Sequence, residues 1–291
     1  MNGVRFSIVL GVFLASAALA TADSIISWDV NAEVSGVTDA TFKRSSNIGD
    51  VSSFDTQFHA IASAQVKPEF LLRLGFEFQR YDFDLPARAP LPNNLESLGV
   101  LVGGDFQFGD AWLFRLDLHP GYYSANGQID GDDFNLPITL GGSFFIGADL
   151  QFVAGVGIDL NRKYPVLPAA GLRWKFAREW VLNAILPRPR LEYLLGEKSV
   201  LYVGGDFRLG TYRVDDSFGE SHGLRRLDNA VVDYTQIRVG AGVSSKIASY
   251  LTLEFEAGCV PLDEFDFHRA DIGVRSQDVP FYARIGLQAQ F

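Results

Sequence analysis

Apolar and polar residues alternate along most of this chain with the period of two that is typical of β-strands. The alternation is clear in residues 69–80, 97–108, 112–123, 150–161 and 250–259. It returns at the end of the sequence, in FYARIGLQAQF (281–291). The pattern predicts an all-β protein whose strands each present one apolar and one polar face.

The links between these segments alternate between short and long. Short turns are expected at 109–111, 147–149, 176–179, 196–199 and 245–249, and longer polar connections at 82–95, 124–134, 214–230 and 261–279. Two links on the longer side are brief, RKYPV (162–166) and PRP (187–189). This layout predicts a closed, up-and-down antiparallel transmembrane β-barrel of about 14 strands. Twelve strands remain possible, because the patterns in 26–36 and 180–194 are weak.

The composition of the polar face indicates which side of the wall it occupies. This face carries many glycines and charges of both signs, for example Gly75, Gly99, Gly155 and Gly240. Glycine weakens a strand on a solvent-exposed face, whereas inside a barrel it relieves crowding. We therefore expect the apolar face to contact lipid and the polar face to surround the lumen. A closed sheet also pairs every backbone group within the protein, which lipid requires.

Aromatic residues cluster near the short turns. Such rings prefer the headgroup level of a membrane, so they predict an interfacial girdle at this rim. The predicted interface residues are Phe108, Trp112, Trp174, Phe176, Trp180 and Tyr250.

The amino terminus has the features of a secretory signal peptide. Arg5 precedes the apolar run FSIVLGVFLASAALA, and small residues follow it up to Ala22. We expect residues 1–22 to be a signal peptide and residues 23–291 to form the barrel. Beyond this segment the sequence has no apolar stretch long enough for a spanning helix.

Net charge and cysteine content argue against a nucleic-acid-binding protein and against a disulfide-stabilised fold. The formal charge is −10, and no basic patch with interleaved aromatics occurs, so nucleic acid is not an expected partner. Cys259 is the single cysteine and cannot form an internal disulfide.

The last strand, FYARIGLQAQF, resembles the carboxy-terminal signature of bacterial outer-membrane β-barrels. The resemblance implies location in the bacterial outer membrane, contact with its lipid and lipopolysaccharide, and recognition by the barrel assembly machinery. The residues that would carry this assembly signal are Phe281, Ala283, Ile285, Leu287, Ala289 and Phe291. The central stretch, residues 155–195, is similar to an uncharacterised family of exported bacterial barrels. That similarity implies architecture and location and no activity.

Charged residues on the expected inner face are the main candidates for function. They could line a pore and tune ion selectivity, or they could form an interior salt-bridge network that fills the lumen. Fourteen-stranded barrels lie between side-chain-filled and water-filled sizes, so both readings stay open. The predicted lumen-lining residues are Arg73, Glu77, Arg115, Asp117, His119, Arg173, Lys175, Arg190, Glu192, Asp206, Arg208, Arg238, Glu254, Glu256 and Arg284.

Catalytic and metal sites are not expected. His119 and Ser124 have opposite parity on one strand, so they face opposite sides. Ser221 and His222 are loop neighbours, and such neighbours do not form a nucleophile–base pair by default. The acidic loops lack a calcium-site pattern, and no histidine has zinc spacing. We therefore expect no enzyme activity and no cofactor and assign no metal site, and the sequence leaves open whether the acidic loops bind a metal.

The sequence favours a porin-like passive channel for small solutes in the outer membrane. The alternatives are a closed structural or interaction barrel without conductance and, third, a barrel-embedded lipid hydrolase. The sequence leaves the solute and the oligomeric state open. It also leaves open whether residues 37–55 form a loop or a plug.

Overall fold

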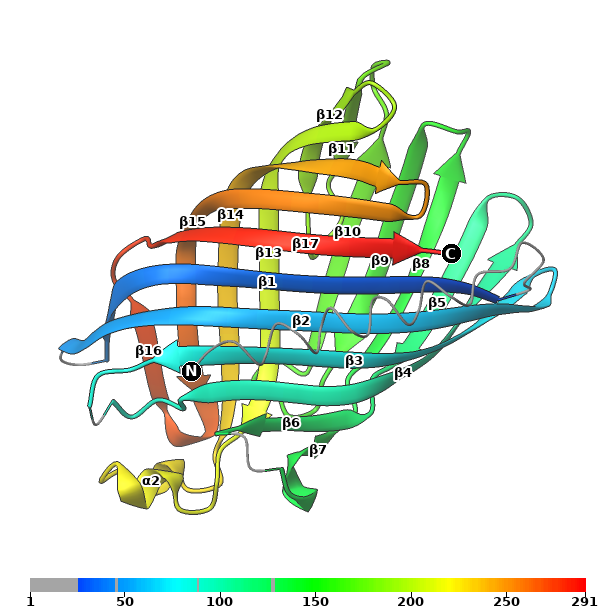
Figure 1. Ribbon diagram of the computed structural model, residues 1–291. Coiled ribbons are helices and arrows are strands. Elements are labelled where there is room, and N and C mark those ends of the chain that lie inside the picture. The colour runs from blue at the N-terminus through cyan, green and yellow to red at the C-terminus, as the bar shows by residue number, and fades with distance from the viewer. Residues whose placement is uncertain (1–25, 45–46, 88, 127–128) are drawn as a thin grey trace.

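The computed structural model describes residues 26–44, 47–87, 89–126 and 129–291. The chain forms a closed antiparallel barrel of 14 strands, which confirms the predicted fold class (Figure 1). The predicted signal peptide, residues 1–22, lies outside the described residues. Within the described ranges, no helix is both long and apolar enough to cross a membrane.

Three of the barrel strands are interrupted and carry two labels each: β5 with β6, β7 with β8, and β16 with β17. The strands are β1 (Ile26–Lys43), β2 (Asn47–Lys67), β3 (Phe70–Asp84), β4 (Asn94–Phe108), β5 (Trp112–Leu118), β6 (Gly121–Ala125), β7 (Phe134–Asn135), β8 (Ile138–Ile146), β9 (Leu150–Ile158), β10 (Val166–Trp174), β11 (Trp180–Asn183), β12 (Arg190–Leu195), β13 (Ser199–Arg213), β14 (Val231–Ala248), β15 (Leu251–Phe267), β16 (Ile272–Ser276) and β17 (Phe281–Gln290). Short helical turns occupy links: η1 (Gly131–Asp133), α2 (Phe218–Ser221), η2 (Arg225–Leu227) and η3 (His268–Ala270).

The first and last strands close the barrel. Antiparallel pairing of β1 with β17 runs from Asp29 opposite Gln290 to Val37 opposite Tyr282. The weakly patterned segment 26–36 is thus part of β1, one of the longest strands. Residues 37–43 and 47–55 also lie in β1 and β2, so the described part of 37–55 is neither a loop nor a plug.

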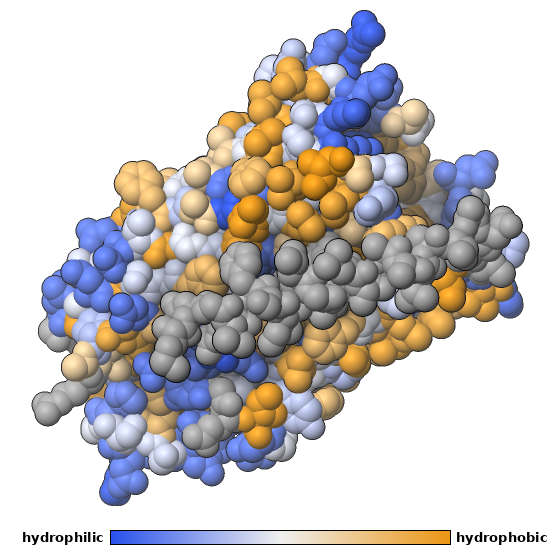
Figure 2. All heavy atoms as spheres, in the orientation of Figure 1, coloured by the Kyte–Doolittle hydropathy of each residue, from blue (hydrophilic) through white to orange (hydrophobic). Residues whose placement is uncertain are grey.

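Apolar side chains cover the outside of the barrel over most of its height. Leu74, Phe76, Val102 and Leu116 are exposed on the outward faces of their strands. In Figure 2, apolar residues lie over the middle of the molecule, and hydrophilic residues gather at the end that carries α2 and the β1–β2 turn. An exposed apolar surface of this extent is typical of a barrel that spans a membrane.

The long-loop end of the barrel corrects the prediction that the inner face is polar throughout. There the interior is filled by an apolar cluster, which we call the outer core. Its rings lie in contact: Phe265 is 5.0 Å from Phe83 and 4.9 Å from Tyr234, centroid to centroid. The buried residues of the outer core are Ala40, Phe42, Val51, Tyr81, Phe83, Leu91, Leu95, Ala125, Tyr212, Val214, Phe218, Leu227, Ala230, Val232, Tyr234, Phe265, Phe267, Ala270, Ile272 and Val274.

The outer core forms because β1–β4 and β13–β16 continue at the long-loop end and pack against each other. Figure 1 shows β13, β14 and β15 crossing behind β1–β4. The ends of β6 and β13 even join directly, through a parallel bridge between Ser124 and Arg213. Two walls that meet exclude water, so their inner positions take apolar residues. The prediction of a long connection over 261–279 was wrong for the same reason, since 261–267 and 272–276 are strand.

Candidate functional site

A cluster of buried charges fills the middle of the lumen, next to the outer core. Its centre is Arg238 on β14, which is fully buried. The Arg238 guanidinium donates to Asp55 Oδ2, to Ser35 Oγ and to Gln236 Oε1, each at 2.6 Å. Every nitrogen of this guanidinium therefore has a partner, which a buried charge requires.

Arg208 on β13 links the same carboxylate, Asp55, to two further carboxylates. It donates to Asp55 and to Glu33, and its Nε lies 2.9 Å from Asp206 Oδ2. All four of these side chains are buried. The three carboxylates around one arginine come from β1, β2 and β13, so the contacts join opposite parts of the wall.

Arg284 on β17 extends the cluster towards β15. It donates to Glu33 Oε2 at 2.7 Å and to Glu256 Oε2 at 2.5 Å, and it also bonds Glu254. Glu254 in turn accepts from Arg190 Nη2 at 2.8 Å. We call the whole set the ionic cluster: Glu33, Asp55, Arg188, Arg190, Asp206, Arg208, Arg238, Glu254, Glu256 and Arg284.

The ionic cluster and the outer core together occupy the barrel axis. Arg208, Arg238 and Arg284 are at most 5% exposed, and the outer core lies between them and the long-loop end. A side-chain network of this kind is one of the two arrangements that the sequence left open. Buried side chains therefore occupy the lumen at these two levels.

The other predicted lumen residues lie outside the ionic cluster. A second group connects β3 to β5 and its continuation, through Arg73 with Asp117 at 2.6 Å and His119 with Glu77 at 2.8 Å. Arg115 pairs with Asp105 at 2.7 Å. Arg173 and Lys175 are exposed, at the end of β10 and just beyond it.

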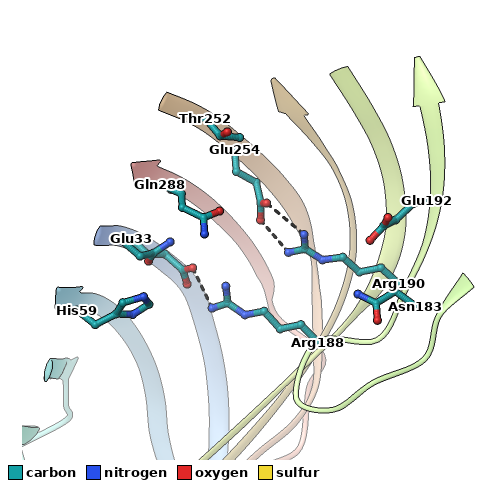
Figure 3. Close-up of a pocket in the computed structure, with 11 residues that line it drawn as sticks. Glu33, His59, Asn183, Arg188, Arg190, Glu192, Thr252, Glu254 and Gln288 are labelled. Carbon is teal, nitrogen blue, oxygen red and sulfur yellow. Dashed lines mark hydrogen bonds and ion pairs between the residues drawn. The ribbon is translucent and has the colours of Figure 1, made fainter. Parts of the chain in front are cut away.

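Below the ionic cluster, towards the short-turn rim, the lumen holds a polar cavity of about 300 Å³. Figure 3 shows Arg188 and Arg190 pointing into it from one side, towards Glu33 and Glu254. Its remaining lining residues are Asn31, His59, Asn183, Glu192, Thr252, Gly286 and Gln288. Asn31 and Gln288 are paired within the β1–β17 seam, near the short-turn ends of both strands, so this cavity lies at the short-turn side of the cluster.

A second cavity of about 280 Å³ shares Asn31, His59 and Arg188 with the first. It continues along Gln57 and Gln79 on one side and along Pro187 and residues 206–209 on the other. We call the two connected cavities the chamber. Arg188, which stands in both, pairs with Glu33 at 2.9 Å and with Asp206 at 3.3 Å.

Sequence reasoning missed three members of the ionic cluster: Glu33, Asp55 and Arg188. Glu33 and Asp55 occupy inward positions at which Asn31, Ser35 and Gln57 are also polar, so the alternation contained a signal. Arg188 lies in the link between β11 and β12. Sequence alone provides no strand pattern there from which its direction could be read.

The predicted interface aromatics are exposed near the short-turn rim. Trp112, Trp174, Trp180 and Tyr250 are 39–47% exposed, Phe176 is 45% exposed and Phe108 is 65% exposed. On the last strand, Phe281, Ala283 and Ile285 are exposed, Leu287 and Phe291 are half-buried, and Ala289 is buried. The Phe291 ring stacks on Tyr250 at 5.5 Å.

Comparisons with known proteins find similarity to solved structures alone. No family model matches the sequence, and no curated protein matches it either. Among solved structures, the chain is similar to an outer-membrane channel from Pseudomonas putida F1, with a TM-score of 0.49, 9% identity and coverage of 91% of this chain and 95% of that one. The P. putida toluene transporter TodX also has a TM-score of 0.49 and 9% identity, over 95% and 92% of the two chains.

A third similar structure is the KdgM porin in complex with oligogalacturonate, with a TM-score of 0.36, 10% identity and coverage of 91% and 99%. The substances named for these proteins are not assigned to this chain.

The Ser–His pairs considered in the sequence analysis have other partners. His222 Nδ1 lies 2.7 Å from the Phe218 carbonyl oxygen, which only a protonated nitrogen can bond. Although Ser221 Oγ lies 3.0 Å from the same nitrogen, a nitrogen that donates its proton cannot accept another from serine. His119 is bonded to Glu77. Within the described residues, no group of three or more His, Cys, Asp or Glu side chains is arranged to hold a metal ion.

The link between β9 and β10, residues 159–165, reaches the far strands. The Lys163 amide donates to Asp233 at 2.9 Å, and its ammonium pairs with Asp266 at 2.7 Å. The hydrogen bond from Asp266 raises the pKa of Lys163 above its usual range. Residues 159–165 therefore lie over the ends of β14 and β15.

Proposed function

We propose that this chain is an integral protein of the bacterial outer membrane, in the channel class, whose axial path is closed and whose chamber admits small molecules. The observation that carries the proposal is the position of the chamber. It is lined by polar residues and adjoins the short-turn rim, while the ionic cluster and the outer core separate it from the long-loop end.

Three features support the outer membrane as the location. The outward faces are apolar, the interface aromatics stand at the short-turn rim, and the last strand carries the alternating pattern that ends at Phe291. In the bacterial layout the tight turns face the periplasm and the longer loops face outwards. The chamber then opens to the periplasm. Outer-membrane lipid and lipopolysaccharide would contact the apolar band.

Single-channel recording in planar bilayers tests the closed axial path. Purified protein inserted into the bilayer is expected to show no steady ohmic conductance in concentrated KCl, because the buried ion pairs and apolar residues leave no hydrated path. A matched run with a general porin checks the insertion protocol. A stable conductance in every insertion event would contradict the proposal and would support the simple porin that the sequence favoured.

We also propose that the last strand is read by the barrel assembly machinery. Deletion of Phe291 is expected to reduce the amount of folded protein in the outer membrane while leaving export unchanged. The measurement is heat-modifiable gel migration of outer-membrane fractions beside total periplasmic and membrane antigen. Phe134→Ala serves as the control, because Phe134 is an exposed phenylalanine at the opposite end. Normal assembly of the protein that lacks Phe291 would contradict the proposal that this residue is part of the assembly signal.

A further inference from the structure

Two strands of the wall have edges without a strand partner. On the side facing β11, β10 pairs only at Arg173 and Trp174, with one further hydrogen bond from Ala184 to Leu172. Within the described part of the chain, no strand pairs with that side of β10 between Val166 and Gly171. On β13, pairing towards β12 ends at Gly204, and hydrogen bonds from Gly205 and Phe207 to the 187–189 link continue it briefly.

The cause is the shortness of β11 and β12. They have 4 and 6 residues, whereas a tilted strand needs about 9 to 11 to cross the hydrocarbon layer. The wall is therefore interrupted between β10 and β13. The interruption is framed on all sides: by β10, by β13, by residues 184–189 on the short-turn side and by residues 159–165 towards the long-loop end. We call it the side window.

The chamber reaches the side window. Its second cavity is lined by Asp206 and Arg208, which face inwards, and also by Phe207 and Leu209, which face outwards. Because residues of both faces line it, the cavity lies along the backbone of β13 at these positions. The edge of β13 at these residues is the one that lacks a partner strand. The cavity therefore lies beside the unpaired edge of β13, where a route from the lumen to the outside of the wall would pass.

The position of the window matters because unpaired backbone is costly in hydrocarbon. Leu209 lies ten residues beyond Ser199 at the short-turn rim, which for a tilted strand is roughly 25 Å, close to the height of the apolar band. The window therefore opens towards the half of the membrane away from the short turns. Irregular backbone at such depth is tolerated where it lines a cavity, which is the arrangement seen here.

We propose that the side window is a lateral passage between the chamber and the distal leaflet, and that its ligands are neutral amphipathic molecules dissolved in that leaflet. The inference rests on the proposed function. If the axial path is closed, a lateral passage is the route by which a ligand reaches the chamber from outside. In the outer-membrane orientation, a molecule would enter from the outer leaflet and leave through the chamber to the periplasm.

The lining of the passage selects the ligand chemistry. Its outer frame is apolar: Val166, Leu186 and Leu209 are 55%, 44% and 49% exposed. Behind it stand uncharged hydrogen-bonding side chains, Gln57 and Gln79. The charged groups there, Arg188, Asp206 and Arg208, are all ion-paired, since each arginine pairs with both Asp206 and Glu33, so they offer no unpaired charge to an ion. A ligand with an apolar skeleton and one or two hydrogen-bonding groups matches an apolar entrance followed by uncharged polar side chains.

The experiment compares entry of two probes into cells of a porin-deficient Gram-negative host that expresses the protein. The apolar probe is N-phenyl-1-naphthylamine, a neutral aromatic amine with one N–H, followed by its fluorescence. The polar probe is nitrocefin, an anion followed by its hydrolysis in the periplasm. The test variant is Leu209→Trp, which narrows the window. The control is Val203→Trp, on the same outward face of β13 but opposite Leu191, where the strand is paired.

Wild-type protein is expected to raise the rate of amine entry severalfold over the empty vector. Leu209→Trp should return the rate to the vector level, and Val203→Trp should leave it raised. Heat-modifiable migration checks that both variants are assembled. Amine entry that equals the vector level, or that both variants reduce equally, would overturn the passage. Faster nitrocefin entry with wild-type protein would instead contradict the closed axis of the proposed function.

Discussion

Replacement of Arg238 by methionine is expected to lower the free energy of unfolding by about 3–5 kcal/mol. Methionine approximates the length of the side chain but leaves Asp55 with Arg208 as its remaining cationic partner. Ser35 and Gln236 also lose their bonds to the guanidinium. A buried carboxylate that loses an ion-pair partner keeps its full desolvation cost, which is the physical reason for the large effect.

The measurement is equilibrium unfolding in urea, followed by tryptophan fluorescence of protein in lipid vesicles. Arg178→Met is the matched control, because the Arg178 side chain is 93% exposed and its pair with Glu179 spans 3.9 Å; a change of less than about 1 kcal/mol is expected there. The double variant Arg238→Met/Asp55→Asn should lose less than the sum of the two single changes. An Arg238→Met protein as stable as the control would contradict the buried, fully paired position of Arg238 in the ionic cluster.

Replacement of Phe265 by alanine is expected to cost about 3–5 kcal/mol, because it removes a fully buried ring and leaves a cavity in the outer core. Phe265 contacts the rings of Phe42, Phe83 and Tyr234, which come from three other strands. The neighbouring walls are held by their own strand pairing, so they can collapse only partly into the space.

Unfolding in urea measures this change too. Phe134→Ala is the control at the same end of the barrel, since Phe134 is 52% exposed; its loss should be about 1 kcal/mol. Equal costs for the two phenylalanines would mean that the inner face at the long-loop end is hydrated and not packed.

The barrel itself could be predicted because strand period and link length are local properties. The period of two and the alternation of short and long links led to the meander, its closure and the strand number of 14. The faces of residues such as Arg208 and Glu254 followed from parity alone. Their partners did not, because Arg208 meets residues 153 and 175 positions away in the sequence.

The outer core was missed although the sequence contains its signal. On β3 the outward positions are apolar up to Phe78 and then become Arg80 and Asp82, while the inward positions change from Gln79 to Tyr81. The alternation thus reverses its phase within one strand. Such a reversal marks the level at which the outside passes from lipid to water and the inside from polar to apolar.

The side window could not be predicted from the local pattern. Residues 180–194 were recognised as weak, yet weakness alone does not say that two strands stop short and leave their neighbours unpaired. That outcome depends on the lengths of β10 and β13, whose contributions to the wall continue where β11 and β12 end. Only the three-dimensional register shows which edges remain.

The seam between β1 and β17 has a consequence for biogenesis. Asp29 meets Gln290, so the barrel cannot close until residues as late in the sequence as Gln290 are available to pair. Until then the edges of β1 and β17 are unpaired and their apolar faces are exposed. Another unfolded chain can pair with these edges, which favours aggregation. Contacts so remote in sequence also form slowly. We therefore expect efficient folding to depend on protection of these strand edges until β1 and β17 pair.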